Sequence, residues 1–545
     1  MALLSVRDLK VALPAGGDRT YAVDGVSMEI DRGETLCVVG ESGSGKSLTA
    51  SAIVGLMPSR SLKVAGGSIL FEGRDTLRMS ARELRALRGG RIGFVFQDPL
   101  SSLNPLERIG KQVSEMLRQH NWHGDRRRRV IEMLAAVQLP SPETLVEAYP
   151  WQLSGGQRQR VMIATALAAE PSLLIADEPT SALDVTTQAQ ILALLRDLTK
   201  RNGTSLFFIT HDFGVVAEMA DRVAVMRGGK LVEYGTRNAV LYQPREDYTR
   251  RLLGSVPPLE AGPARPAGET ILRAAGLEKS WVTRAGMFRP GRTVNALRNV
   301  SFELGRGNTL AVVGESGSGK STLARVLMRL IDADAGRVEL AGISGNYLDL
   351  RSRELTALRQ KVQMVFQDPY ASLNPRRRIG AAIAQGPLTH GEDRETVRRH
   401  VLGLLARVRL DSSAAERYPN EFSGGQRQRI AIARALAMRP RVLIADEAVS
   451  ALDVSVQAEI LTLLQDIQRE EGLSMVFVTH DLRVAARMAD QIIVMQSGMI
   501  VEHGAMEEVL SAPKHSYTAK LINAVPQLSS AEAAEPPSNI LELKK

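Results

Sequence analysis

The chain has 545 residues, too many for a single ordinary core, and its apolar content of 44% is typical of globular protein. Its 69 basic and 60 acidic residues give a formal net charge of +9, which by itself selects neither nucleic acid nor a membrane surface as a partner. A single cysteine excludes an internal disulfide and a cysteine-built metal site. No apolar run is long enough to span a bilayer, and no signal-peptide pattern opens the chain, so a cytosolic protein is expected.

The first predicted strand–loop–helix unit carries Gly-Glu-Ser-Gly-Ser-Gly-Lys-Ser, and the same eight residues return unchanged in the second half. The pattern G-x-x-x-x-G-K-[ST] is typical of loops whose backbone N–H groups bind nucleotide phosphates. We expect each lysine to reach the β- and γ-phosphates and each final serine to bind Mg²⁺. The predicted loops comprise Gly40, Glu41, Ser42, Gly43, Ser44, Gly45, Lys46 and Ser47, and Gly314, Glu315, Ser316, Gly317, Ser318, Gly319, Lys320 and Ser321.

Next along each half, a strand is followed by Phe-Gln-Asp-Pro, which contains Gln97 in the first copy and Gln367 in the second. A glutamine amide hydrogen-bonds both water and a metal ligand, so we expect these side chains to contribute to the Mg²⁺ site and to sense the γ-phosphate. Helix-like stretches at 130–134 and 401–405 then predict a smaller helical subdomain inserted into each α/β core.

A Ser-Gly-Gly-Gln sequence opens an Arg- and Ala-rich helix in each half. Serine is a good N-cap and the glycines leave the first N–H groups accessible, so each helix start is a predicted anion site. Because the lysine loop already holds one phosphate, each such site is predicted to bind the nucleotide held by the other half, in a head-to-tail pairing of the two halves. The residues are Ser154, Gly155, Gly156 and Gln157, and Ser423, Gly424, Gly425 and Gln426.

An apolar strand ending in Asp-Glu follows, at Asp177-Glu178 and again at Asp446-Glu447. A lone Asp-Glu pair would more often cap a helix, but its repetition behind a phosphate loop favours catalysis. The aspartates are predicted to contact Mg²⁺, and the glutamates to orient and deprotonate the attacking water. After the next strand, His211 and His480 stand in Thr-His-Asp; an isolated histidine there is usually structural, but this pair is predicted to donate to the γ-phosphate.

The order of these motifs divides the chain into two nucleotide-binding cassettes. Short, unalternated apolar runs predict strands buried on both faces, as in a parallel sheet covered by helices, so the expected class is α/β. We expect a first domain over residues 1–255, a Pro/Gly/Ala-rich linker over 256–270 and a second domain over 271–526. Residues 527–545 are expected to form a poorly ordered tail.

With these motifs in order, the chain resembles the ABC ATPases almost end to end, and Leu153–Gln157 reads as the family signature Leu-Ser-Gly-Gly-Gln. The second copy begins with Phe422 instead of leucine. The resemblance implies two tandem P-loop domains. Each has a RecA-like parallel core, an antiparallel β subdomain and a helical subdomain. It also implies ATP and Mg²⁺ as ligands.

Narrower features resemble the ATPases of dipeptide and oligopeptide importers, including fused forms of the glutathione and microcin C type. These features are the sequences around Gln97 and Gln367, and the segments Pro244–Leu252 and Pro513–Leu521, which carry Tyr248 and Tyr517. The resemblance implies two separate membrane permeases, a substrate-binding protein, no nucleic acid partner, and a peripheral location on the cytoplasmic face of the bacterial inner membrane. Cargo remains open among peptide, glutathione, nickel, opine and antibiotic peptide.

Two departures from the resemblance matter. The family's adenine-stacking aromatic corresponds to Tyr21, whereas the aligned residue of the second half is Asn295, and no cysteine cluster for an iron–sulfur centre is present. Alternative hypotheses are a soluble tandem ATPase acting on ribosomes or translation factors, and an exporter half-system or DNA-repair ATPase. The short proline-rich linker argues against the first, and the absence of fused membrane helices, long coiled coils and zinc cysteines against the second.

Overall fold

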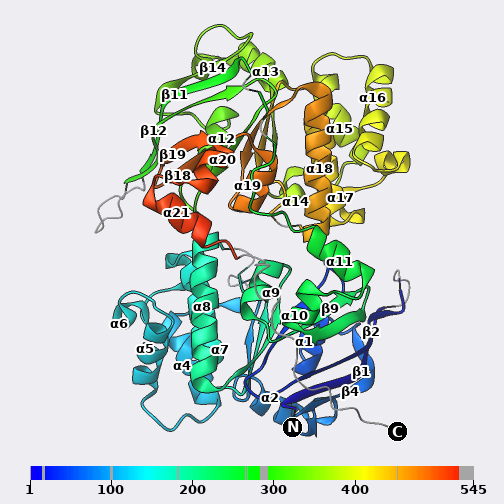
Figure 1. The fold of residues 1–545 in the computed structure, drawn as a ribbon, viewed down its shortest axis with the longest axis vertical. Helices are drawn as coiled ribbons and strands as arrows, with labels where there is room; N and C mark the ends of the chain where they lie inside the picture. Colours follow the sequence, from blue (N-terminus) through cyan, green and yellow to red (C-terminus); the bar gives the residue numbers. More distant parts are fainter. Residues whose placement is uncertain are drawn as a thin grey trace. The chain divides into compact units, whose positions relative to one another are not determined.

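We describe a computed structural model of the chain, covering residues 2–14, 19–98, 102–180, 183–263, 265–266, 268–282, 293–450 and 452–526. The chain forms two compact units (Figure 1). The first contains Met1–Leu183 and Thr187–Ser255, and the second contains Val256–Val525. The expected tail over 527–545 lies outside the described residues.

The first unit contains two sheets. A four-stranded antiparallel sheet has the order β2-β1-β4-β5, and a six-stranded sheet has the order β10-β9-β3-β8-β7-β6, in which only β10 is antiparallel. The strands are β1 (Leu4–Ala12), β2 (Tyr21–Ile30), β3 (Thr35–Val39), β4 (Lys63–Phe71), β5 (Arg74–Asp75), β6 (Ile92–Val95), β7 (Leu173–Asp177), β8 (Ser205–Ile209), β9 (Arg222–Arg227) and β10 (Lys230–Thr236).

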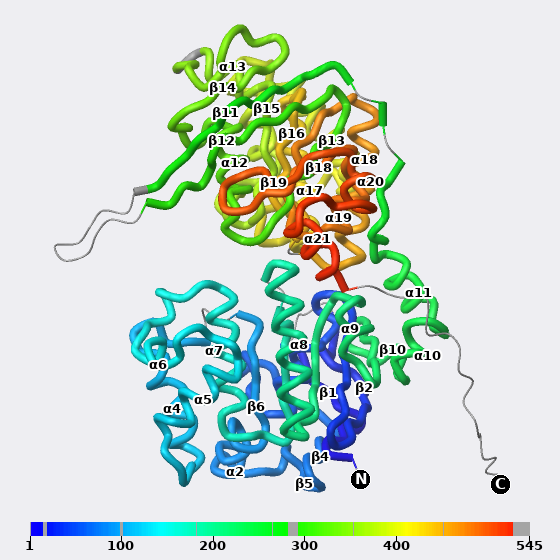
Figure 2. Tube along the Cα trace, turned by 60° about the vertical axis from the view of Figure 1, so that its left-hand side comes forward, coloured from blue at the N-terminus to red at the C-terminus, as the bar shows by residue number. Residues whose placement is uncertain are grey.

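Some helices of the first unit cover its six-stranded sheet, and others form a separate group beside that sheet. Figures 1 and 2 both show α4 to α7 together, away from β1 and β2. The helices are α1 (Lys46–Ile53), α2 (Ala81–Leu87), α4 (Ile109–Gln119), α5 (Arg126–Ala136), α6 (Pro142–Leu145), α7 (Gly155–Leu167), α8 (Val185–Asn202), α9 (Phe213–Met219), α10 (Arg237–Tyr242) and α11 (Asp247–Gly254), with 3₁₀ turns at η1 (Thr76–Arg78) and η2 (Pro150–Gln152).

The second unit repeats this plan, with a three-stranded sheet of order β12-β11-β14 and a six-stranded sheet of order β15-β16-β17-β13-β18-β19. Its strands are β11 (Thr270–Val282), β12 (Thr293–Gly305), β13 (Thr309–Val313), β14 (Ala335–Leu340), β15 (Val362–Val365), β16 (Val442–Asp446), β17 (Ser474–Val478), β18 (Gln491–Gln496) and β19 (Met499–Ala505). Its helices are α12 (Lys320–Leu327), α13 (Ser352–Lys361), α14 (Pro369–Ser372), α15 (Ile379–Thr389), α16 (Arg394–Arg407), α17 (Gly424–Leu436), α18 (Val454–Glu471), α19 (Leu482–Met488), α20 (Met506–Ser511) and α21 (Ser516–Asn523), with 3₁₀ turns η3 (Tyr347–Asp349), η4 (Ser412–Glu416) and η5 (Pro419–Glu421).

The unalternated apolar runs of the sequence are explained by strands that face two cores. All five residues of β16 are buried. Val442 and Ile444 pack toward the antiparallel strands, whereas Leu443 and Ala445 pack toward the helices on the other face. A strand covered on both sides has no solvent face, so apolar and polar residues do not alternate along it. The predicted α/β architecture, with its antiparallel and helical subdomains, is therefore confirmed.

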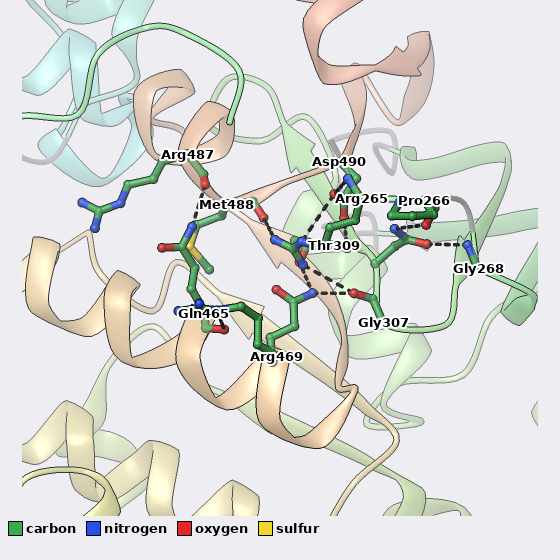
Figure 3. Close-up of polar contacts among 12 residues, drawn as sticks. Arg265, Pro266, Gly268, Gly307, Thr309, Gln465, Arg469, Arg487, Met488 and Asp490 are labelled. Carbon is green, nitrogen blue, oxygen red and sulfur yellow. Dashed lines mark hydrogen bonds and ion pairs between the residues drawn. The ribbon is translucent and has the colours of Figure 1, made fainter. Parts of the chain in front are cut away.

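The Pro/Gly/Ala-rich segment before β11 is bonded to the second unit. The guanidinium of Arg265 donates to the carbonyl oxygens of Gly307 and Met488 at 3.4 and 3.3 Å, and its backbone N–H donates to Oδ1 of Asp490 at 3.1 Å (Figure 3). Asn308 also exchanges bonds with this segment: its Nδ2 donates to the Pro266 carbonyl, and its Oδ1 accepts from the Gly268 N–H. Side chains of the second unit thus accept from the N–H groups of Arg265 and Gly268 and donate to the Pro266 carbonyl, which satisfies backbone groups that no strand pairing satisfies.

Candidate nucleotide site

Each predicted phosphate loop joins a buried central strand to a helix, β3 to α1 and β13 to α12. Its first glycine has a left-handed backbone, with φ of 145° at Gly40 and 148° at Gly314. A Cβ atom there would lie 2.1 Å from the Met226 carbonyl oxygen in the first unit and 2.2 Å from that of Met495 in the second. Only glycine fits so close an approach of two backbones.

The loop lysines are buried and fold back onto their own loops. Lys46 Nζ donates to the carbonyl oxygens of Gly40 and Glu41 at 2.6 and 2.9 Å. Lys320 Nζ makes the equivalent bonds to Gly314 and Glu315 at 2.7 and 2.8 Å. Burial lowers the pKa of Lys320, so an anion beside this ammonium would be stabilised strongly.

A hydroxyl and a carboxylate meet where the predicted Mg²⁺ site lies. Ser47 Oγ donates to Asp177 Oδ1 at 3.0 Å, and Ser321 Oγ donates to Asp446 Oδ1 at 3.2 Å. Burial raises the pKa of Asp177 to about 6, and it also raises the pKa of Asp446. A carboxylate held in this way gains from a nearby cation.

The Glu, Gln and His side chains predicted to be catalytic come together in both units. Gln97 Nε2 donates to Glu178 Oε2 at 3.1 Å, and His211 Nδ1 lies 3.4 Å from the same oxygen. Burial opposes the charged form, but the hydrogen bonds from His211 and Gln97 and the positive charges of His211 and Lys46 together outweigh it and leave the pKa of Glu178 below its usual range. The glutamate is therefore ionised at neutral pH, as a general base must be.

The second unit repeats this cluster. Gln367 Nε2 donates to Glu447 Oε2 at 2.7 Å, and His480 Nδ1 lies 3.4 Å from Glu447 Oε1. Burial alone would lower the pKa of His480, but its hydrogen bond to Glu447, together with the negative charges of Glu447 and Asp481, raises it. Both glutamates have left-handed backbones, with φ of 46° at Glu178 and 47° at Glu447. Such a conformation is uncommon outside glycine and is concentrated at functional sites.

Each Ser-Gly-Gly-Gln sequence forms a capping box at its helix start. Ser154 Oγ accepts from the Gln157 N–H at 3.2 Å, and Gln157 Oε1 accepts from the Ser154 N–H at 3.0 Å. Ser423 and Gln426 repeat these bonds at 3.3 and 3.0 Å. The two serines are exposed, so each cap presents a helix N-terminus to solvent.

The residues aligned at the predicted adenine position differ between the units. Tyr21 is half-buried at the start of β2, where it pairs with Ala12, whereas Asn295 is exposed on β12 and pairs with Ser280. Trp281, the residue after Ser280, is 47% exposed, and Lys279 Nζ lies 5.1 Å from the centre of its ring. A tryptophan at the end of a strand was the feature of the sequence that could have indicated an aromatic residue for this position. Alignment on the phosphate loops identified Asn295 instead.

Arg19 is a second residue that the sequence interpretation missed. Its Nη2 donates to the Gly43 carbonyl oxygen at 2.5 Å, which brings a further cation to the first phosphate loop. The aligned residue of the second half is Thr293, which is uncharged. Nothing in the local sequence distinguishes Arg19 from the many surface arginines of this chain.

A phosphate loop ahead of a magnesium-type Ser/Asp pair, with a Glu/Gln/His cluster at the ends of parallel strands, defines a P-loop nucleotide hydrolase, present twice. Among the described residues, no group of three or more His, Cys, Asp or Glu side chains is placed to hold a metal. The predicted Mg²⁺ site does not need one, because its expected ligands are a hydroxyl, an amide and a single carboxylate. The described part of the chain also contains no helix long and apolar enough to cross a membrane.

Comparison with known proteins identifies the family. The ABC transporter family matches residues 23–181 and 297–450, and the C-terminal region of oligopeptide/dipeptide transporters matches residues 232–276 and 501–543. The chain therefore belongs to the ABC transporter family, and its two cassettes are ATP-binding ATPase domains.

Several relatives match over nearly the full length. A peptidoglycan transport ATP-binding protein, YejF of Agrobacterium fabrum, is 46% identical over 97% of this chain and 97% of its own length. A glutathione import ATP-binding protein, GsiA of Pectobacterium atrosepticum, is 44% identical over 96% of this chain and 89% of its own. A solved dimeric bacterial ABC transporter cassette is 30% identical, covering 43% of this chain and 99% of that chain, with a TM-score of 0.39.

Proposed function

We propose that this chain is the ATP-hydrolysing, energy-coupling subunit of a bacterial peptide-type importer, peripheral on the cytoplasmic face of the inner membrane. The observation that carries the proposal is that each half combines a Glu/Gln/His cluster beside its phosphate loop with a match to the oligopeptide-transporter C-terminal region. Its partners are two membrane permeases and a substrate-binding protein. The names of the relatives, which concern glutathione and peptidoglycan, support a peptide-like cargo.

In this proposal ATP is the substrate and Mg²⁺ its companion ion. Two hydroxyls support the fit: Ser44 Oγ and Ser318 Oγ are buried in the phosphate loops and have no hydrogen-bond partner among the described residues. Bound Mg²⁺ would be held by Ser47, Gln97 and Asp177 in the first unit, where it would neutralise phosphate charge. The second set is Ser321, Gln367 and Asp446.

The residues of the chain then perform the hydrolysis. Lys46 exchanges its loop carbonyls for the β- and γ-phosphates, and Glu178 orients a water molecule and takes its proton. His211 holds Glu178 ionised and lies where an imidazole can donate to the γ-phosphate. Lys320, Glu447 and His480 do the same in the second unit.

The exposed capping boxes support head-to-tail use of the two sites. A helix N-terminus with an accessible serine binds phosphate well, and each lysine loop already supplies one phosphate-binding end. We assign Ser423 and its helix to the nucleotide at Lys46, and Ser154 and its helix to the nucleotide at Lys320.

Base stacking is proposed to differ between the sites. Tyr21 is the predicted aromatic of the first. In the second, Asn295 offers no ring, and Trp281, on the strand paired with β12, is the candidate that supplies one.

The transport hypothesis is tested against the ribosome hypothesis by fractionation of cells that express the tagged chain with or without a pair of candidate permeases. We expect the chain in the membrane fraction only when the permeases are present, and we expect ATP hydrolysis by the purified complex to rise when the cargo-loaded binding protein is added. Cosedimentation with ribosomes, independent of the permeases, would overturn the proposal. Both matching family models describe transporters, which favours the first outcome.

A further inference from the structure

A tyrosine of each C-terminal extension contacts a phosphate loop. The backbone N–H of Glu41 donates to the hydroxyl of Tyr248 on α11 at 3.4 Å. In the second unit the N–H of Glu315 donates to the hydroxyl of Tyr517 on α21 at 3.0 Å. The partners are more than 200 residues apart in sequence, and the contact occurs at the same position of both loops.

The peptide group that these tyrosines bind is also the one that holds the loop lysine. The carbonyl oxygen of Gly40 and the N–H of Glu41 belong to one peptide unit. Lys46 Nζ donates to that oxygen at 2.6 Å while Tyr248 accepts from that N–H. Hydrogen bonds at both ends fix the plane of a peptide group, so the tyrosine orients the donor and acceptor groups beside the predicted phosphate site.

The helices that carry the tyrosines are themselves anchored to the core. Glu233 on β10 accepts the backbone N–H groups of Arg245 and Glu246, at 2.8 and 3.4 Å, directly before α11. Glu502 on β19 accepts those of Lys514 and His515, at 2.7 and 3.1 Å, directly before α21. Two carboxylate bonds at each helix start leave little freedom for the tyrosine that follows.

The tyrosine environments suit this role. Tyr248 and Tyr517 are each only 7% exposed, and the guanidinium of Arg227 lies 4.8 Å from the ring centre of Tyr248. Burial raises the pKa of Tyr517 to about 12, so its hydroxyl keeps its proton at physiological pH and remains a neutral acceptor for the loop.

We propose that Tyr248 and Tyr517 are positioning residues for ATP, which makes each C-terminal extension a working part of its own nucleotide site. The inference rests on the proposed function, because it takes the two loops to bind ATP phosphates. It assigns to the extension a role in nucleotide affinity in addition to any contact with partners.

The test uses the full chain with one site disabled at a time. Tyr248→Phe is placed in a Lys320→Ala chain and Tyr517→Phe in a Lys46→Ala chain, and ATP binding and hydrolysis are measured. Loss of one hydrogen bond predicts about a threefold to tenfold rise in Kd and KM for ATP, with kcat changed less than about twofold. Tyr242→Phe is the matched control, since the Tyr242 hydroxyl makes no hydrogen bond to another described residue.

The outcomes separate the two levels of the proposal. If single-site chains bind no ATP even with both tyrosines intact, the proposed function fails. If they bind ATP and the Tyr→Phe variants, with unchanged melting temperatures, bind it equally well, the positioning role is wrong. If a Tyr→Phe variant melts at a lower temperature, Glu233→Ala and Glu502→Ala are measured as well. These variants loosen the helix but keep the tyrosine hydroxyl, so the inference requires that they also raise the KM for ATP. An unchanged KM in these variants contradicts the inference.

Discussion

The side-chain amide of Gln367 donates to Oε2 of Glu447 at 2.7 Å, and Gln97 repeats this bond to Glu178 at 3.1 Å. Each predicted catalytic base is thus held by the glutamine expected to sense the γ-phosphate. We therefore expect a change at either glutamine to affect a carboxylate that is proposed to act on water.

The first prediction concerns the two glutamates. Glu178→Gln and Glu447→Gln together should reduce ATP turnover by about 10²-fold or more, because an amide cannot take a proton from water. ATP binding should persist, since the lysine loops are intact. Steady-state phosphate release and equilibrium binding are the two measurements. Glu132→Gln, in a surface ion pair with Arg128 on α5, is the control; turnover at the level of this control in the double variant would refute the assignment.

Metal removal gives the second prediction. EDTA should abolish hydrolysis while the lysine loops still retain some ATP, and added Mg²⁺ should restore turnover. Asp177→Asn with Asp446→Asn should raise the Mg²⁺ concentration needed for half-maximal rate, because one anionic ligand is lost at each site. A titration of rate against free Mg²⁺ checks this. An unshifted titration curve would show that neither aspartate is a ligand of the metal.

The third prediction tests the segment bonded by Arg265. Asp490, whose side chain is only 7% exposed, forms an ion pair with the Arg265 guanidinium at 3.6 Å. Arg265→Ala should therefore destabilise the second unit by about 1–3 kcal/mol and lower its melting transition by several degrees. Arg273→Ala, which removes an exposed pair with Glu303, should have little effect. Hydrogen exchange over residues 256–270 locates the change, and unchanged protection there would disprove it.

Cys37 provides the fourth prediction. Its side chain is fully buried on β3, and burial raises the pKa of the thiol. The native protein should therefore react with a thiol reagent far more slowly than the same chain in denaturant, because the reactive species is an accessible thiolate. Spectrophotometric titration follows both rates. Equal rates would mean that the central strand is open to solvent.

The sequence predicted what short local patterns encode. Each Asp-Glu pair lies at the end of its strand, with the aspartate as the last residue of β7 or β16. The helices begin directly after Ser154 and Ser423, and α5 and α16 lie where helical inserts were expected. Repetition strengthened each of these predictions, because a motif whose role is ambiguous when it occurs once is less ambiguous when it occurs at equivalent positions of two domains.

Contacts between distant residues were not predictable in this way. The tyrosine bonds to Glu41 and Glu315 join the end of each domain to its start, and the tie between Arg265 and Asp490 depends on how a Pro-rich segment docks. The left-handed backbone at Glu178 and Glu447 follows from tertiary structure: the N–H of each glutamate still donates to the neighbouring strand, at Ile209 and Val478. Local propensity carries no signal for such features.

The central claim is that the Ser-Gly-Gly-Gln helix of each half binds the nucleotide held by the other half. Counting bound ATP in a Glu178→Gln/Glu447→Gln chain tests this claim most directly. Aspartate is a good N-cap, so Ser154→Asp and Ser423→Asp keep the helix start while repelling phosphate. Combined with Lys46→Ala, Ser423→Asp should leave about one ATP per chain, because both changes damage one site, whereas Ser154→Asp should leave almost none. If instead Ser154→Asp leaves one ATP and Ser423→Asp leaves none, each half completes its own site and the account is wrong.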